Sequence, residues 1–165
     1  MEKALFSTGN GEWETPDDLF SALNLEYNFD LDVCATPHNA KCKRYFSKNQ
    51  DGLSQEWRGN IWCNPPYGRE IDKWIAKAVQ SYQSQNCSRI VMLLPARTDT
   101  KWIHEHIFKK ADVIFLKGRL KFKNSEGVCN SAPFPSMLAV FDNSPKKVRF
   151  LANKLGGHAI LRDRT

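Results

Sequence analysis

The heptapeptide CNPPYGR, residues 63–69, combines groups that can hold an amine and a flat ring. Its two prolines fix their own φ angles and lack N–H groups, so the backbone is stiff and rich in acceptors. Asn64 adds a side-chain carbonyl oxygen, and Tyr67 adds an aromatic ring. These groups suit a planar molecule with an exocyclic amino group, because two oxygens can accept its two hydrogens. A proline-rich surface turn is the alternative interpretation.

The surrounding pattern places this motif at the end of a strand. The segment GNIWC, residues 59–63, is typical of a strand, and residues 71–82 carry apolar side chains at the spacing of one helix face. We also expect strands at 29–35, 43–46, 89–95 and 111–118, two strands within 119–141, and helices at 15–24, 99–110 and 144–157. Alternating strands and helices indicate a doubly wound α/β sheet, in which ligands bind beyond the carboxyl ends of the strands. The segments DVCA, NPPY and PARTDT all fall at such ends, which favours one shared site.

The composition suits a single domain with a basic C-terminal half. The chain has 165 residues and a net charge of +6, with a charge of −2 over residues 1–96 and +8 over residues 97–165. A basic half favours a polyanionic partner such as nucleic acid. No apolar run is long enough for a membrane helix and the N-terminus has no signal-peptide core, so we expect a soluble intracellular protein. The five cysteines include no C-x-x-C pair, and we expect no metal site.

An ordered set of segments extends this pattern to a known family. The segments EWETP, LDVCA, NAKCKRYF, DGL, NIWCNPPYGR, LLPARTDTKWIHEHI, LKGRLKF and APFPSMLAVF together resemble the phage-type DNA N6-adenine methyltransferases. The resemblance runs from about Trp13 to Phe141. It implies one S-adenosylmethionine-dependent domain over residues 1–165, with a Rossmann-like methyltransferase fold of the α/β class. The sheet would be mostly parallel and doubly wound, with a C-terminal antiparallel hairpin. The resemblance also implies a phage or prophage protein in the cytoplasm of a bacterial host.

The same resemblance implies direct transfer of a methyl group from S-adenosylmethionine to N6 of an adenine flipped out of double-stranded DNA. The catalytic residues would be Asn64, Pro65, Pro66 and Tyr67. Asn64 Oδ1 and the Pro65 carbonyl would accept the two amino hydrogens and disperse the developing positive charge, and Tyr67 would stack on the base. We therefore expect Asn64→Ala and Tyr67→Ala to abolish or severely lower turnover and to leave the fold intact.

Cofactor binding would involve the segments WETP, LDVCA and DGL. The first is similar to the part of the family that holds the methionine end, and in the second Asp32 would contact the cofactor's amino-acid end. In DGL, Asp51 can bond the adenine amino group of the cofactor. The expected cofactor-binding residues are Trp13, Thr15, Pro16, Asp32, Cys34, Ala35, Asp51 and Asn64. Structural roles are the alternatives: Thr15 can cap a helix that begins at Pro16, and the two aspartates can stabilise turns.

Basic and polar residues near predicted strand ends form the expected DNA-binding set. It consists of Arg69, Arg97, Thr98, Lys101, Lys117, Arg119, Lys121 and Lys123. Lys121 and Lys123 alternate with Leu120 and Phe122, which predicts a strand with one basic and one apolar face. The following segment NSEGVCNSAPF is the candidate for base recognition. A solvated strand face is the alternative for the lysines.

Two other functions agree with these residues. The first keeps the chemistry and changes the acceptor to cytosine N4, an RNA base or a glutamine amide, although the basic half disfavours the amide. The second is a non-catalytic DNA-binding module that retains the fold, but an intact NPPY segment argues against it. The sequence indicates no oligomeric state.

Overall fold

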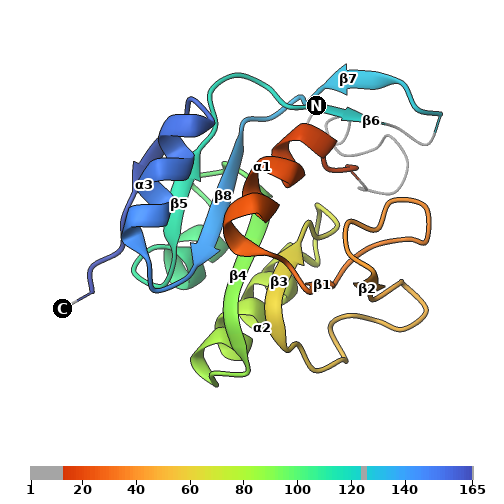
Figure 1. Cartoon of the computed structure of the whole chain (residues 1–165), viewed down its shortest axis with the longest axis horizontal. Coiled ribbons are helices and arrows are strands. Elements are labelled where there is room, and N and C mark those ends of the chain that lie inside the picture. The colour runs from red at the N-terminus through yellow and green to blue at the C-terminus, as the bar shows by residue number, and fades with distance from the viewer. Residues whose placement is uncertain (1–12, 124–125, 165) are drawn as a thin grey trace.

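A computed structural model describes residues 13–123 and 126–164, which fold around one central sheet (Figure 1). The strands of this sheet are β1 (Leu31–Asp32), β2 (Arg44–Tyr45), β3 (Gly59–Cys63), β4 (Cys87–Pro95), β5 (Asp112–Phe115), β8 (Ser136–Phe141) and β9 (His158–Ile160). Within the described residues, these seven strands lie in the order β2-β1-β3-β4-β8-β5-β9. Two further strands, β6 (Lys121–Lys123) and β7 (Cys129–Ser131), form a separate antiparallel pair.

The central sheet is mixed. Strands β2, β1, β3 and β4 pair in parallel, whereas β8 is antiparallel to both β4 and β5, and β9 is antiparallel to β5. Strand β5 therefore runs in the same direction as β4, and only β8 and β9 run against them. The expected mostly parallel α/β sheet is confirmed at this level.

Among the described residues of 119–141 there are three strands, where two were expected. The antiparallel hairpin that forms is β6–β7, outside the central sheet, and residues 136–141 instead insert between β4 and β5. All six residues of β8 are buried, so this strand has no face that could lie on the surface. A strand buried on both faces is stable only in the interior of a sheet that is covered on both sides.

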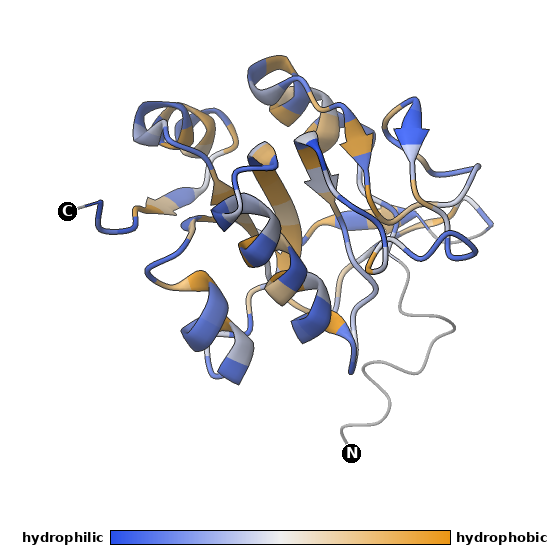
Figure 2. Cartoon of the chain, turned by 90° about the horizontal axis from the view of Figure 1, so that it is seen from below, coloured by the Kyte–Doolittle hydropathy of each residue, from blue (hydrophilic) through white to orange (hydrophobic). Residues whose placement is uncertain are grey.

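Helices cover both faces of the sheet. Helix α1 (Asp17–Tyr27) and helix α3 (Pro145–Lys154) lie on one face, where Lys147 Nζ donates to the carbonyl of Glu26 at 3.1 Å. Helix α2 (Ile71–Gln83) and the short π-helix η2 (Ile103–Ile107) cover the other face. Figure 2 shows helices on either side of the sheet and hydrophobic residues concentrated in its central strands.

The apolar side chains of α2 follow the expected helix face. Ile71, Trp74, Ile75, Ala78 and Val79 are all buried, at the i, i+3, i+4 spacing that turns one stripe toward the sheet. The predicted strand over residues 29–35 is shorter than expected, since β1 covers only Leu31–Asp32. The predicted helix over residues 99–110 is reduced in the same way to a few residues around η2. Strand β9 was not predicted, because three residues are too few to show a periodic pattern.

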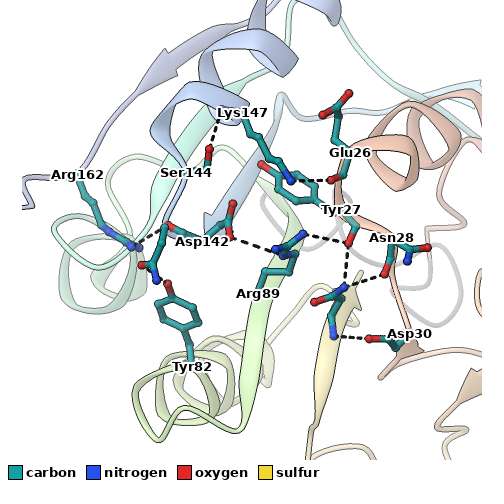
Figure 3. A network of polar contacts seen from close by, with 12 residues as sticks. Glu26, Tyr27, Asn28, Asp30, Tyr82, Arg89, Asp142, Ser144, Lys147 and Arg162 are labelled. Atoms are coloured by element: carbon teal, nitrogen blue, oxygen red, sulfur yellow. Dashed lines mark hydrogen bonds and ion pairs between the residues drawn. The ribbon is translucent and has the colours of Figure 1, made fainter.

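A polar network joins several helices and strands at the end of the sheet where β3 and β4 begin (Figure 3). Arg89 of β4 lies 3.6 Å from Asp142, which follows β8, and Asn60 Nδ2 donates to the carbonyl of Tyr27 at 3.1 Å. These contacts join α1, β3, β4 and the end of β8, and the Lys147–Glu26 bond adds α3. The carboxyl ends of β1, β3 and β4 lie at the opposite edge. No helix in the described part of the chain has the length and apolar character needed to cross a bilayer.

Candidate functional site

A cavity of about 210 Å³ lies beside the carboxyl ends of β1 and β3. Asn64, Pro65 and Pro66 border it directly after β3, so the stiff segment faces open space rather than the core. Nine of the residues expected from the sequence line this cavity, namely Trp13, Thr15, Asp32, Cys34, Ala35, Asp51, Asn64, Pro65 and Pro66. The structure therefore brings together four segments that are separate in the sequence.

The amide of Asn64 is held in one orientation. Its Nδ2 donates to the carbonyl of Trp13 and to Thr15 Oγ1, the latter at 3.0 Å. The carbonyl of Trp13 can only accept, so the nitrogen rather than the oxygen of the amide must face it. Both Nδ2 hydrogens are then used. Asn64 Oδ1 is buried and has no hydrogen-bond partner among the described residues.

A buried acceptor without a partner costs about 1–3 kcal/mol, which a ligand N–H would recover. Asn64 is one of the residues that line the cavity, and its unpaired oxygen is buried beside this space. The residues present thus fit a molecule that carries an N–H group at this position.

Thr15 and Pro16 differ from the sequence expectation. The capping role considered for Thr15 is not found, because Pro16 occupies the N-cap position and no side chain caps the helix. The Thr15 hydroxyl accepts from Asn64 Nδ2 instead, because the chain enters the helix beside the NPPY segment. Pro16 does not line the cavity.

Asp32 is a buried carboxylate on the cavity wall, with a side chain that is 2% exposed. Its oxygens accept from the backbone N–H groups of Cys34 and Lys41, at 3.2 and 3.1 Å. Burial raises the pKa of Asp32 to about 6, and these hydrogen bonds and the Lys41 charge only partly oppose the rise. The ammonium of Lys41 is engaged in an ion pair with Asp17. A cationic ligand in the cavity would therefore be attracted by a charge that the protein neutralises incompletely.

The loop that contains Asp51 packs closely against the end of β1. A Cβ atom on Gly52 would lie 2.1 Å from the carbonyl oxygen of Val33 and 3.0 Å from the Trp74 ring, so only glycine allows this approach. The indole of Trp57 also donates to the Gly52 carbonyl at 2.8 Å. This close packing fixes the neighbouring Asp51 on the cavity wall.

Tyr67 occupies a different position from the one expected. Its side chain is 5% exposed, its hydroxyl donates to the Leu93 carbonyl at 3.0 Å, and its ring meets Phe134 edge to face at 5.4 Å. Burial raises the pKa of its phenol well above the ordinary value. Tyr67 does not line the cavity and is almost fully buried, so its ring is not presented to the cavity in this structure. The expectation that Tyr67→Ala leaves the fold intact also conflicts with this burial.

The expected DNA-binding residues gather at the same edge of the sheet as the cavity. All are exposed except Arg97, which is half-buried, and they follow β3, β4 and β5 or belong to β6. Lys121 and Lys123 flank buried Phe122, which confirms the predicted alternation. Lys101 lies 3.6 Å from Glu105, and Lys123 lies 3.5 Å from Asp17. In the candidate recognition segment, residues 124–125 lie outside the described residues.

The β6–β7 hairpin contacts the cavity wall through aromatic rings. The Trp13 ring meets Phe122 and Phe134 edge to face, at centroid distances of 5.5 and 5.4 Å. Glu14 forms an antiparallel bridge with Lys123. The segment 13–15 therefore lies between the basic hairpin and the NPPY segment.

Several cavity residues were missed by sequence reasoning, among them Thr36, Asn39, Lys41, Phe46, Ser47, Lys48, Trp62 and Trp74. Lys41 and Phe46 belong to NAKCKRYF, a segment of the family resemblance that could have indicated them. Trp74 lies on the apolar face of α2, where the pattern indicates only a core residue.

Comparisons with known proteins identify a family to which the chain is similar. A family model described as DNA N-6-adenine-methyltransferase (Dam) matches residues 5–157. A DNA N-6-adenine-methyltransferase of Escherichia phage T1 is 33% identical over 111 residues, which is 66% of this chain and 45% of the phage protein. A protein of the same name from Haemophilus phage HP1 is 30% identical over 136 residues, covering 79% of this chain and 78% of the relative. The putative methyltransferase YfdM of Escherichia coli K12 is 33% identical over 64 residues, covering 34% of this chain and 70% of that protein. The chain thus spans less than half of the T1 protein and about four fifths of the HP1 protein.

Proposed function

The chain belongs to the DNA N-6-adenine-methyltransferase family, and on this premise we propose that it methylates N6 of adenine in DNA with S-adenosylmethionine as the donor. The observation that carries the proposal is the buried, unpaired Asn64 Oδ1 beside the cavity. An acceptor held in this way suits a donor such as an amino group and does not suit a carbonyl. Relatives in phages T1 and HP1 support a phage or prophage origin, and thus action in the cytoplasm of a bacterial host.

The cavity residues fit the cofactor in charge and in hydrogen bonding. S-adenosylmethionine supplies an electrophilic methyl group on a sulfonium cation when it is bound. Asp32 would hold the cationic amino-acid end, and its incompletely neutralised charge supports this role. Asp51, also on the cavity wall, would accept from the adenine amino group of the cofactor. Trp13, Cys34 and Ala35 would line the rest of the cofactor site.

The chain's own part in the reaction is to bind and orient the target amine. Asn64 Oδ1 and the Pro65 carbonyl would accept the two N6 hydrogens, which draws the nitrogen lone pair out of conjugation with the ring. Fixed acceptors also stabilise the positive charge that develops on this nitrogen, and they need no reorganisation during the reaction. Holding both partners in the cavity contributes by proximity, which in favourable cases is worth about 7–11 kcal/mol.

Double-stranded DNA with a flipped adenine is the proposed form of the substrate. The exposed basic residues at the same edge of the sheet would contact the phosphates, with Lys121 and Lys123 on one face of the hairpin. Tyr67 is buried in this structure, so stacking on the base would require its ring to become exposed. The mixed sheet with helices on both faces supports a Rossmann-like methyltransferase domain over residues 1–165.

Methyl transfer from labelled S-adenosylmethionine to unmethylated DNA tests the proposal. Digestion to nucleosides and mass spectrometry should detect N6-methyladenine with the wild-type protein and almost none with Asn64→Ala. N4-methylcytosine without N6-methyladenine would show that the acceptor is wrong. DNA binding without any methylated nucleoside and without cofactor binding would instead support the non-catalytic module.

A further inference from the structure

We propose that Thr15 is a positioning residue that, together with the Trp13 carbonyl, fixes the Asn64 amide as a pure acceptor for the target amine. This inference rests on the proposed function and assigns a residue that acts through Asn64 rather than on the substrate. It differs from the sequence expectation, in which Thr15 caps α1 or contacts the cofactor.

The two hydrogen bonds at Asn64 Nδ2 have different consequences. The Trp13 carbonyl has no hydrogen to give, so it determines which end of the amide faces the segment 13–15. A rotated amide would place Oδ1 against this carbonyl oxygen, which is repulsive. The Thr15 hydroxyl accepts the second hydrogen at 3.0 Å and so fixes the remaining direction of the amide plane. With both hydrogens engaged, Asn64 can offer only an acceptor to a ligand.

Thr15 lies just before a helix, where a threonine hydroxyl would ordinarily cap the helix N-terminus. Its bond to Asn64 instead is therefore informative. In the sequence TPDD, threonine followed by proline and two aspartates is a strong helix-start signal. Nevertheless, α1 has no side-chain cap, and the hydroxyl bonds Asn64, which lies 49 positions later in the chain. Thr15 is 5% exposed, so its hydroxyl is directed by the protein rather than by solvent.

The segment that carries Thr15 is itself held from the other side. The Trp13 ring packs against Phe122 and Phe134, and Glu14 bridges Lys123 of the hairpin. These contacts prevent the segment from following the amide if Asn64 rotates. The orientation of the catalytic amide therefore depends on Thr15 as a fixed point.

The test compares Thr15→Val, which keeps the shape of the side chain and removes the hydroxyl, with Thr15→Ser, which keeps the hydroxyl. Loss of the orienting bond should lower kcat of Thr15→Val by about tenfold, with little change in the cofactor Kd measured by calorimetry. Thr15→Ser should recover most of the lost rate. In an Asn64→Ala background, Thr15→Val should cause no further loss, because the two residues act as one unit.

Three outcomes would overturn the inference. A normal kcat with a weaker cofactor Kd would make Thr15 a cofactor ligand only, and unchanged kinetics would leave it no role in turnover. Absence of adenine methylation by the wild-type protein would overturn the proposed function and this inference together.

NMR provides a second measurement if Thr15→Val folds poorly. The Asn64 side-chain amide signals, identified by their loss in Asn64→Ala, should exchange more slowly than those of exposed asparagines, and rapid exchange would contradict the two bonds.

Discussion

The buried carboxylate of Asp32 should make cofactor binding depend on pH. Its pKa is raised to about 6 in the free protein, so about nine tenths of the molecules carry the charge at pH 7 and about one tenth at pH 5. A cationic cofactor end binds the ionised form, and the cofactor's amino group stays protonated throughout this range. We therefore expect the Kd of S-adenosylmethionine to rise about tenfold as the pH falls from 7 to 5.

The raised pKa of Asp32 also makes the stability of the free protein depend on pH. Cofactor affinity rises with pH, whereas this contribution to stability falls. A carboxyl group whose pKa is about 6 when folded and 3.8 when unfolded retains its proton more tightly in the folded state. The Asp32 contribution to the unfolding free energy should therefore fall by about 3 kcal/mol in total with rising pH, with most of the change between pH 3.8 and 6. Cofactor binding lowers this pKa, so the stabilisation by the cofactor should be largest above pH 6.

Isothermal titration calorimetry at pH 5, 6 and 7, in buffers of different ionisation enthalpy, measures both the Kd and the protons released. The matched control is Asp32→Asn, which keeps the side-chain shape and cannot titrate. The nearby Lys41 pairs with Asp17. A wild-type Kd that does not change between pH 5 and 7, or the same tenfold change in Asp32→Asn, would refute the reasoning.

Three further predictions concern the packing of residues around the site and the proposed contacts with DNA. Gly52→Ala should lower the unfolding free energy in urea by at least about 2 kcal/mol, since its Cβ would meet the Val33 carbonyl at 2.1 Å; wild-type stability would contradict this packing. Tyr67→Phe should cost only about 1 kcal/mol, whereas Tyr67→Ala should cost about 3–5 kcal/mol, because it empties a buried ring site; equal costs in thermal unfolding would be inconsistent with that burial. Lys121→Gln should reduce the slope of log K against log salt for DNA binding by about 1, while Lys154→Gln on α3 should leave it unchanged; equal slopes for both variants would remove Lys121 from the phosphate contacts.

Much of the scaffold could be predicted from local patterns. The helix face of α2, the strand before NPPY and the alternation around Phe122 follow from the spacing of apolar residues alone. The insertion of β8 between β4 and β5 could not be predicted in this way, because a fully apolar strand does not indicate its neighbours. The short strand β9 gave no pattern at all.

The residues of the candidate site also include some that could be predicted from the sequence and some that could not. Nine expected residues line the cavity, because strand ends, proline pairs and the family segments are all visible along the chain. The burial of Tyr67 was not visible, since it depends on Phe134, a residue 67 positions later. The missed wall residue Trp74 looks like any core residue until Gly52 is packed against its ring.

The sequence by itself determined the stiff, acceptor-rich segment after β3 and the types of groups available around it. Only the tertiary structure decided that Asn64 turns its nitrogen toward Trp13 and Thr15, 51 and 49 positions earlier, and leaves its oxygen unpaired. It also decided that Asp32 is buried deeply enough to raise its pKa. The reason is physical: proline geometry and side-chain chemistry are local, whereas hydrogen-bond partners and the loss of water depend on which distant residues pack together.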